Sequence, residues 1–159
     1  MGLTFCQRWW VRKQKPLNII NAEEAQSCHD QNKSYSVVVE NHNRVTHVLD
    51  ITGNTVIVRF FNELDQMYLI YEFIRIQEHR IFLKGAIHYE YDGNTKTEEL
   101  IFNFNESGYV FMQKWNRLTN ESIQKELHVN VTANWDEYPA FGDYTRLLIV
   151  ERDATNSLL

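Results

Sequence analysis

The sequence predicts a mainly β protein: an antiparallel meander of about nine strands, preceded by one short helix. From residue 34 onward, apolar and polar residues alternate over short segments, which is the period of a half-buried strand. Turn-forming Asn, Asp and Gly residues separate these segments at short intervals. Aromatic residues, which favour strands, make up 13% of the 159 residues. Short connections place consecutive strands side by side, and nine long strands in one sheet would curl or close into a barrel.

Residues 1–33 are expected to form an N-terminal segment outside the meander. Asn21 with Glu24 three residues later has the form of a helix N-cap, which predicts a short helix over about residues 22–29. Trp9 and Trp10 lie among basic residues, and we expect them to pack as a lid over one end of the β-core. An RNA-stacking platform and a membrane-surface helix are the alternatives.

Nine later segments carry the alternating pattern, and turn signals separate most of them. In chain order they cover residues 35–40, 45–51, 55–60, 67–76, 81–91, 100–104, 109–115, 126–133 and 144–151. Asp92-Gly93-Asn94 is the strongest hairpin turn, whereas residues 116–122 are polar and are expected to form a loop. We expect a single domain over residues 1–159, with the meander over 34–152 and a frayed tail over 153–159.

Alternation also assigns side chains to faces of the predicted sheet. In the fifth segment, six residues are expected to share one face: Ile81, Leu83, Gly85, Ile87, Tyr89 and Tyr91. In the sixth and seventh segments, five residues are expected to point inward: Leu100, Phe102, Phe104, Phe111 and Trp115.

The charge of the chain is uneven, and this narrows the class of partner. The net charge is −5, but residues 1–16 hold four basic residues and no acid, so the remainder carries −9. An acidic body is a poor match for nucleic acid and suits a basic protein partner, although mild acidity also serves solubility alone. Cys6 and Cys28 lack the spacing of a metal or redox motif and are expected to be free thiols. Without a visible signal peptide or an apolar run of membrane-spanning length, the expected location is the cytoplasm.

No known catalytic or metal-binding pattern occurs in the sequence, so we expect neither an enzyme nor a cofactor. The nucleophile elbow, the P-loop, the dinucleotide fingerprint and the HExxH motif are all missing. His42 and His47 flank a turn but are expected to be solvated rather than metal ligands. Glu98 and Glu99 are adjacent on a strand and therefore point to opposite faces, which does not suit a shared acid–base pair.

Two segments combine aromatic and acidic residues and are the candidate partner-binding sites. Large aromatic rings give rigid contact area, and acids can meet Arg or Lys on a partner. The candidate residues are Tyr89, Glu90, Tyr91, Asp92, Glu98, Glu99, Trp135, Asp136, Glu137, Tyr138 and Asp143. For the segment over residues 134–144, a loop whose aromatic rings plug the end of the barrel is an equal alternative.

The chain is small and acidic, has an aromatic-rich β pattern, and contains the segment Trp135–Tyr144, which ends Tyr-Pro-Ala-Phe-Gly-Asp-Tyr. In these features it resembles bacterial toxin-immunity proteins, including those of contact-dependent growth inhibition systems. The resemblance implies a cytoplasmic inhibitor that binds a cognate toxin domain, a nuclease above all, and occludes its active site without a cofactor. The architecture also looks like lipocalin and fatty-acid-binding barrels, although the Gly-x-Trp typical of lipocalins is missing. An intracellular carrier of a small apolar ligand is therefore the alternative function.

Overall fold

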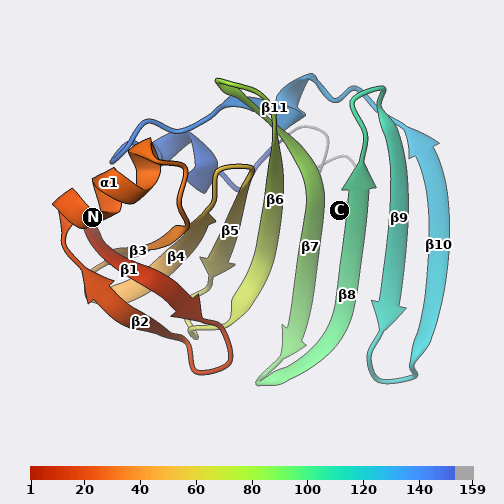
Figure 1. Ribbon diagram of the computed structural model, residues 1–159. Helices are drawn as coiled ribbons and strands as arrows, with labels where there is room; N and C mark the ends of the chain where they lie inside the picture. Colours follow the sequence, from red (N-terminus) through yellow and green to blue (C-terminus); the bar gives the residue numbers. More distant parts are fainter. Residues whose placement is uncertain (153–159) are drawn as a thin grey trace.

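The computed structural model describes residues 1–152, and within them eleven strands form one antiparallel sheet (Figure 1). The strands are β1 (Gly2–Trp10), β2 (Lys15–Ile20), β3 (Tyr35–Asn41), β4 (Arg44–Ile51), β5 (Thr55–Phe61), β6 (Met67–Gln77), β7 (Arg80–Asp92), β8 (Thr95–Phe104), β9 (Tyr109–Asn116), β10 (Glu121–His128) and β11 (Trp135–Glu137). The helical elements are α1 (Ala22–Asp30) and two 3-10 turns, η1 (Thr132–Asn134) and η2 (Thr145–Leu148). The predicted mainly β meander with one short helix is confirmed.

The strand order leaves the sheet open, without closure into a barrel. From β3 to β10 the strands follow one another as neighbours, while β1 pairs with β3 and β2 with β1. Strands β2 and β10 are therefore the two edges, and they lie at opposite ends of the sheet (Figure 1). Of the two expected forms, a curled sheet and a closed barrel, the described residues adopt the curled sheet. Strand β11 pairs with one end of β7, where β8 has already diverged.

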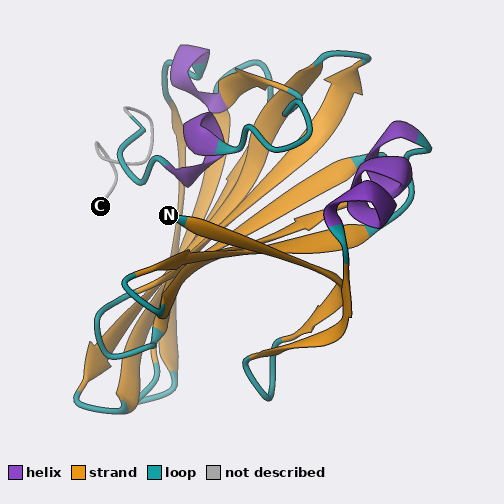
Figure 2. Ribbon diagram, turned by 90° about the vertical axis from the view of Figure 1, so that its left-hand side faces the viewer, coloured by secondary structure: helices purple, strands orange, loops and turns teal. Residues whose placement is uncertain are grey.

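One face of the sheet carries the main hydrophobic core. Its largest fully buried side chains come from neighbouring strands and include Tyr35, Phe60, Tyr71, Phe73 and Phe102. Helix α1 packs against β1 and β3, and the segment after β10 crosses the same core through η1, β11 and η2. Figure 2 shows this C-terminal segment on one side of the strands and the β1–β2 hairpin projecting on the other. We call the side with the main core the covered face and the opposite side of β5–β10 the open face.

Helix α1 begins as the sequence predicts. The Asn21 side chain accepts a hydrogen bond from the Glu24 amide (2.8 Å), and the Glu24 carboxylate accepts one from the Asn21 amide (3.1 Å). This capping box satisfies two amides that the first helical turn leaves unpaired. The helix is only nine residues long and buries Ala25, so its tertiary contacts hold it in place.

The first twenty residues form a hairpin that extends the sheet, so the expectation of a lid outside the meander is wrong. Trp9 is 4% exposed and lies with Cys6, Val38 and Val48 in a second small core on the side opposite the main core. The signal for these strands is weak because the segment is rich in basic residues. Strand β1 alternates all the same: Phe5 opposes Val37 on the covered face, and Cys6 points to the other side.

The predictions also differ from the structure near the C-terminus. The last strand, predicted over residues 144–151, is instead the 3-10 turn η2, and the strand predicted over 126–133 is β10, Glu121–His128. Strand β10 was missed in part because its residues 121–126 are exposed on both faces and show no apolar alternation. The predicted tail over 153–159 lies outside the described residues.

Candidate partner-binding face

The open face carries a row of isoleucines that crosses three neighbouring strands. Ile70 of β6 pairs with Ile87 of β7, and Ile87 pairs with Ile101 of β8. Partners in an antiparallel ladder point to the same side, so the three side chains stand next to one another. Each of them remains only half-buried within residues 1–152. An apolar row of this kind, left partly exposed by its own chain, is a candidate contact surface.

A shallow hollow of about 280 Å³ lies at the centre of this row. Gly85 forms part of its floor, and the walls include Ile57, Arg59 and Glu72 on one side and Ile101 and Asn103 on the other. A Cβ atom at residue 85 would lie 3.5 Å from the Glu72 Oε2 atom, an ordinary van der Waals distance. The absence of a side chain at residue 85 therefore leaves the hollow empty. The neighbouring atoms would still leave room for a methyl group there.

Tyr89 and Glu99, two of the predicted partner-binding residues, extend the open face beyond the isoleucine row. Tyr89 pairs with Glu99, and Glu99 pairs with Trp115. The Lys96 ammonium lies 3.5 Å from the centre of the Tyr89 ring, and Arg117 forms an ion pair with Glu99. Burial raises the pKa of Tyr89 and lowers the pKa of Lys96. The Tyr89 ring is thus held by Lys96, and the neighbouring Glu99 carboxylate already has Arg117 as its partner.

The other predicted residues of this segment point elsewhere or lie at the turn. Glu98 forms an ion pair with Lys114 (3.3 Å) and opposes Glu90 across the ladder. The Tyr91 hydroxyl donates a hydrogen bond to the Met67 carbonyl (2.8 Å). Glu90 and Asp92 are exposed, so they are the acids of this segment that are most accessible to a partner.

The second predicted segment, Trp135–Tyr144, lies at the other end of β7. Trp135 pairs with Phe82, whereas Tyr91 pairs with Lys96, and nine residues of strand separate the two places by roughly 30 Å. The two candidate segments therefore form two separate surfaces, at opposite ends of β7. Glu137 and Asp143 are exposed, while the remaining predicted residues of this segment make contacts within the molecule.

Asp136 shows why this segment is fixed. Its carboxylate binds Arg146 through Nε (2.8 Å) and Arg152 through Nη2 (3.2 Å), and its side chain is 5% exposed. Arg152 also donates to the carbonyls of Ala133 (3.1 Å) and Arg146 (3.0 Å). A buried ion pair with these additional hydrogen bonds fastens the C-terminal segment across the covered face.

Tyr138 joins the same segment to α1 and the sheet. Its hydroxyl donates to the Thr52 carbonyl (3.1 Å), the Arg75 guanidinium lies 3.9 Å from its ring centre, and His29 stacks on it. The segment over residues 134–144 was expected either to bind a partner or to close one end of the core with its aromatic rings. The contacts of Tyr138 fit the second alternative.

A buried chain of polar groups completes the attachment. His29 Nδ1 and the Tyr35 hydroxyl share a hydrogen bond of 2.8 Å, and the Tyr35 and Tyr144 hydroxyls share one of 3.2 Å. Burial lowers the pKa of His29 and raises the pKa of Tyr35. Three elements distant in sequence, α1, β3 and the C-terminal segment, are tied together here.

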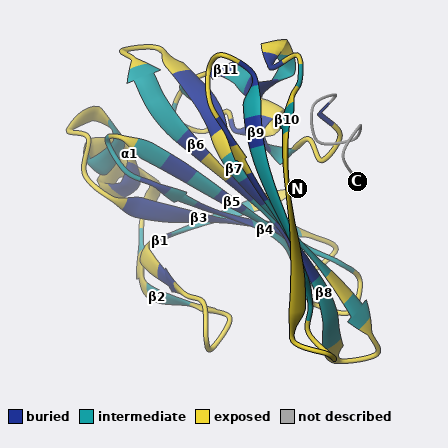
Figure 3. Cartoon of the chain, turned by 90° about the vertical axis from the view of Figure 1, so that its right-hand side faces the viewer, coloured by how far each residue is buried: buried dark blue, intermediate teal, exposed yellow. Residues whose placement is uncertain are grey.

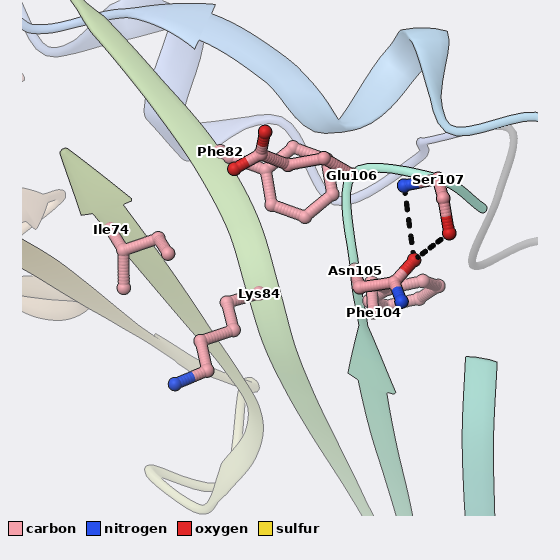
Figure 4. A pocket seen from close by; sticks show the side chains of 7 residues that line it. All are labelled: Ile74, Phe82, Lys84, Phe104, Asn105, Glu106 and Ser107. Atoms are coloured by element: carbon pink, nitrogen blue, oxygen red, sulfur yellow. Dashed lines mark hydrogen bonds between the residues drawn. The ribbon is translucent and has the colours of Figure 1, made fainter. Parts of the chain in front are cut away.

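A second hollow, of about 390 Å³, opens where β8 leaves β7 (Figure 4). Ile74, Phe82, Lys84 and Phe104 line it, and the turn after β8 closes one side. In that turn the Asn105 side chain accepts hydrogen bonds from the amide and the hydroxyl of Ser107, at 3.0 and 2.7 Å. The polar groups of this turn bond to each other, and Lys84 is the only basic residue of the lining.

Sequence reasoning missed the isoleucine row because of a β-bulge. The pairing of β6 with β7 shifts between Phe73 and Glu72, so Ile81 and Leu83 belong to the covered side while Gly85, Ile87 and Tyr89 belong to the open face. These residues were expected to share one face. Similarly, Phe111 and Trp115 lie on the open face and not with Phe102. Gly85 in the middle of the strand was the available signal, because a glycine there often marks a bend or a bulge.

No group of three or more His, Cys, Asp or Glu side chains within residues 1–152 is arranged to hold a metal ion. Cys6 and Cys28 are both free. None of the helices in the described part of the chain is long and apolar enough to cross a membrane.

Comparisons of the chain with protein family models, curated protein sequences and solved structures found no match.

Proposed function

We propose that this protein is a cytoplasmic immunity protein that neutralises a cognate bacterial toxin domain by binding it through the open face of the sheet. The observation that carries the proposal is the half-exposed row of Ile70, Ile87 and Ile101, bordered by Tyr89 and Trp115. Protein interfaces commonly combine an apolar and aromatic centre with a polar rim. The open face has this composition, with Glu72 and Asn103 beside the row.

The charge of the chain supports a basic partner. The net charge is −5, and two exposed acids lie on or beside the open face: Glu72 lines the hollow, and Asp92 lies at the turn after β7. Acids around an apolar contact surface speed the approach of a basic protein and disfavour acidic competitors. A nuclease domain, whose active site must attract phosphates, is the class of toxin that such a surface fits. In this proposal the bound protein blocks access to that site.

The carrier alternative receives less support from the described residues. Phe102 and Phe104 stack on each other in the main core, and Phe104 also lines the hollow where β8 leaves β7. Phe111 and Trp115, which were expected to line the same cavity, lie on the other face. A carrier remains a prediction that ligand-binding measurements can address.

The test uses the toxin-like reading frames that neighbour this gene. Each is expressed with and without the protein, and survival of the cells is measured. The proposal expects one toxin to be neutralised and its inactive form to bind the purified protein in calorimetry. Ile87→Glu, which places a charge in the centre of the row, is expected to reduce the affinity at least about tenfold and to abolish protection.

The matched control is Ile19→Glu on β2, because Ile19 is an exposed isoleucine far from the open face. This variant is expected to protect as well as the unchanged protein. The proposal is contradicted if no neighbouring toxin is neutralised, or if Ile87→Glu protects as well as Ile19→Glu does.

A further inference from the structure

Strand β10 is an edge whose outer side has no partner among residues 1–152. It pairs with β9 over its whole length, Glu121–His128, without a register shift. Its first six side chains are exposed on both faces (Figure 3). A long, regular edge strand presents a row of unpaired amides and carbonyls, and it is therefore a template for another strand.

The opposite edge, β2, carries the features that prevent such pairing. Pro16 has no amide hydrogen to donate, and Asn18 has a φ of +52°, which interrupts the extended backbone. Strand β10 contains no proline and no residue with a positive φ, so only one of the two edges is protected in these ways.

The sequence of β10 is complementary to itself in one antiparallel register. When a two-fold axis passes through Ile123, this residue meets Ile123 of a second copy, and Glu121 meets Lys125 of the second copy on each side of the axis. Residues 121, 123 and 125 alternate to the same face, so the apolar pair and both ion pairs are adjacent. Ile123 is 64% exposed in the single chain, and the pairing would cover it.

Other symmetric registers on this face are less favourable. An axis through Lys125 would bring two lysines together, and an axis through Glu121 would bring two glutamates together. Like charges directly opposite each other destabilise a strand pair. Among the registers with the axis through residue 121, 123 or 125, the charges of β10 therefore favour the one centred on Ile123.

We propose that two copies of this protein associate through antiparallel pairing of their β10 strands, centred on Ile123, so that the two sheets become continuous. The unpaired backbone groups of β10 become the hydrogen-bonding groups of the interface. This inference goes beyond the proposed function and does not depend on it, because it concerns an edge of the sheet and not the open face.

Sedimentation velocity across a concentration series tests the pairing. The unchanged protein is expected to shift from monomer to dimer as its concentration rises. Glu121→Lys alone places like charges opposite each other in both ion pairs, and so does Lys125→Glu alone. Each is expected to raise the dissociation constant about tenfold or more. An equal mixture of the two variants restores both ion pairs, so a heterodimer is expected to form with about the original affinity.

The mixture also controls for misfolding, because complementation requires both variants to be folded. Ile19→Lys on the protected β2 edge is the matched control and is expected to leave the dimer unchanged. The inference is overturned if the unchanged protein stays monomeric, if mixing fails to restore association, or if Ile19→Lys weakens the dimer as much as Glu121→Lys.

Discussion

Ile101 and Phe102 are neighbours on β8, but they belong to two faces of the sheet that differ in what lies over them. Phe102 is 1% exposed, stacks on Phe104 and belongs to the main core that α1 and the C-terminal segment cover. Ile101 points to the open face and stays half-exposed. The contrast teaches that the strand pattern sets only the direction of a side chain. Its burial depends on elements distant in the sequence.

The largest effect is expected from truncating a side chain on the covered face. Phe102→Ala removes a fully buried ring from the main core and is expected to lower the free energy of unfolding by about 4 kcal/mol, because a cavity remains. Ile101→Ala on the open face is expected to cost about 1 kcal/mol or less. Urea unfolding of both variants measures the difference, and equal losses would contradict the division into a covered and an open face.

A smaller but still substantial effect is expected from the segment that covers the core. Asp136→Asn leaves Arg152 without its buried carboxylate and is expected to cost about 3 kcal/mol. Asp143→Asn is the matched control, since Asp143 is exposed, and a change within about 0.5 kcal/mol is expected. If both variants unfold at the same urea concentration, the buried ion pair does not hold the segment in place.

Much of the covered face could be predicted from the sequence, and much of the open face could not. Alternation located β3–β9, and Asn21 with Glu24 located α1, because these signals are local. Gly85 in mid-strand is a sign of a bulge in β7, but a glycine does not tell whether the register shifts, and the shift reverses the faces expected for Ile81 and Leu83 relative to Ile87. The candidate acid Asp136 was read as a partner contact because its Arg152 partner is sixteen residues away along the chain.

The pH dependence of stability separates the two faces in another way. His29 lies in α1, and His47 and His88 lie on the covered side of β4 and β7; burial lowers the pKa of each below the ordinary value of 6.5. The folded chain keeps them neutral, whereas the unfolded chain protonates them as the pH falls through 6.5. Their contribution to stability is therefore present above this pH and is lost between 6.5 and their lower pKa values in the folded chain.

His88→Leu tests this directly, because the buried Nδ1 of His88 has no hydrogen-bond partner within the described chain. The variant is expected to lose less stability on acidification than the unchanged protein does. Urea midpoints from about pH 8 to about pH 5 give the comparison. An identical slope for the two proteins would show that His88 does not contribute to the acid sensitivity of the covered face.

The smallest change in stability is expected at Gly85, in the centre of the open face. A methyl group there meets the Glu72 side chain at an ordinary distance of 3.5 Å, and Gly85 is not among the glycines with a positive φ. Gly85→Ala reduces the freedom of the unfolded chain, so a gain of about 0.5 kcal/mol is expected. Gly85→Leu fills the hollow further and is expected to weaken the proposed binding of a toxin domain while the fold is retained. If Gly85→Ala instead lowers the free energy of unfolding by more than about 1 kcal/mol, the hollow serves packing within the protein. A face that is open for a partner should tolerate this methyl group, because the neighbouring side chains leave room for it.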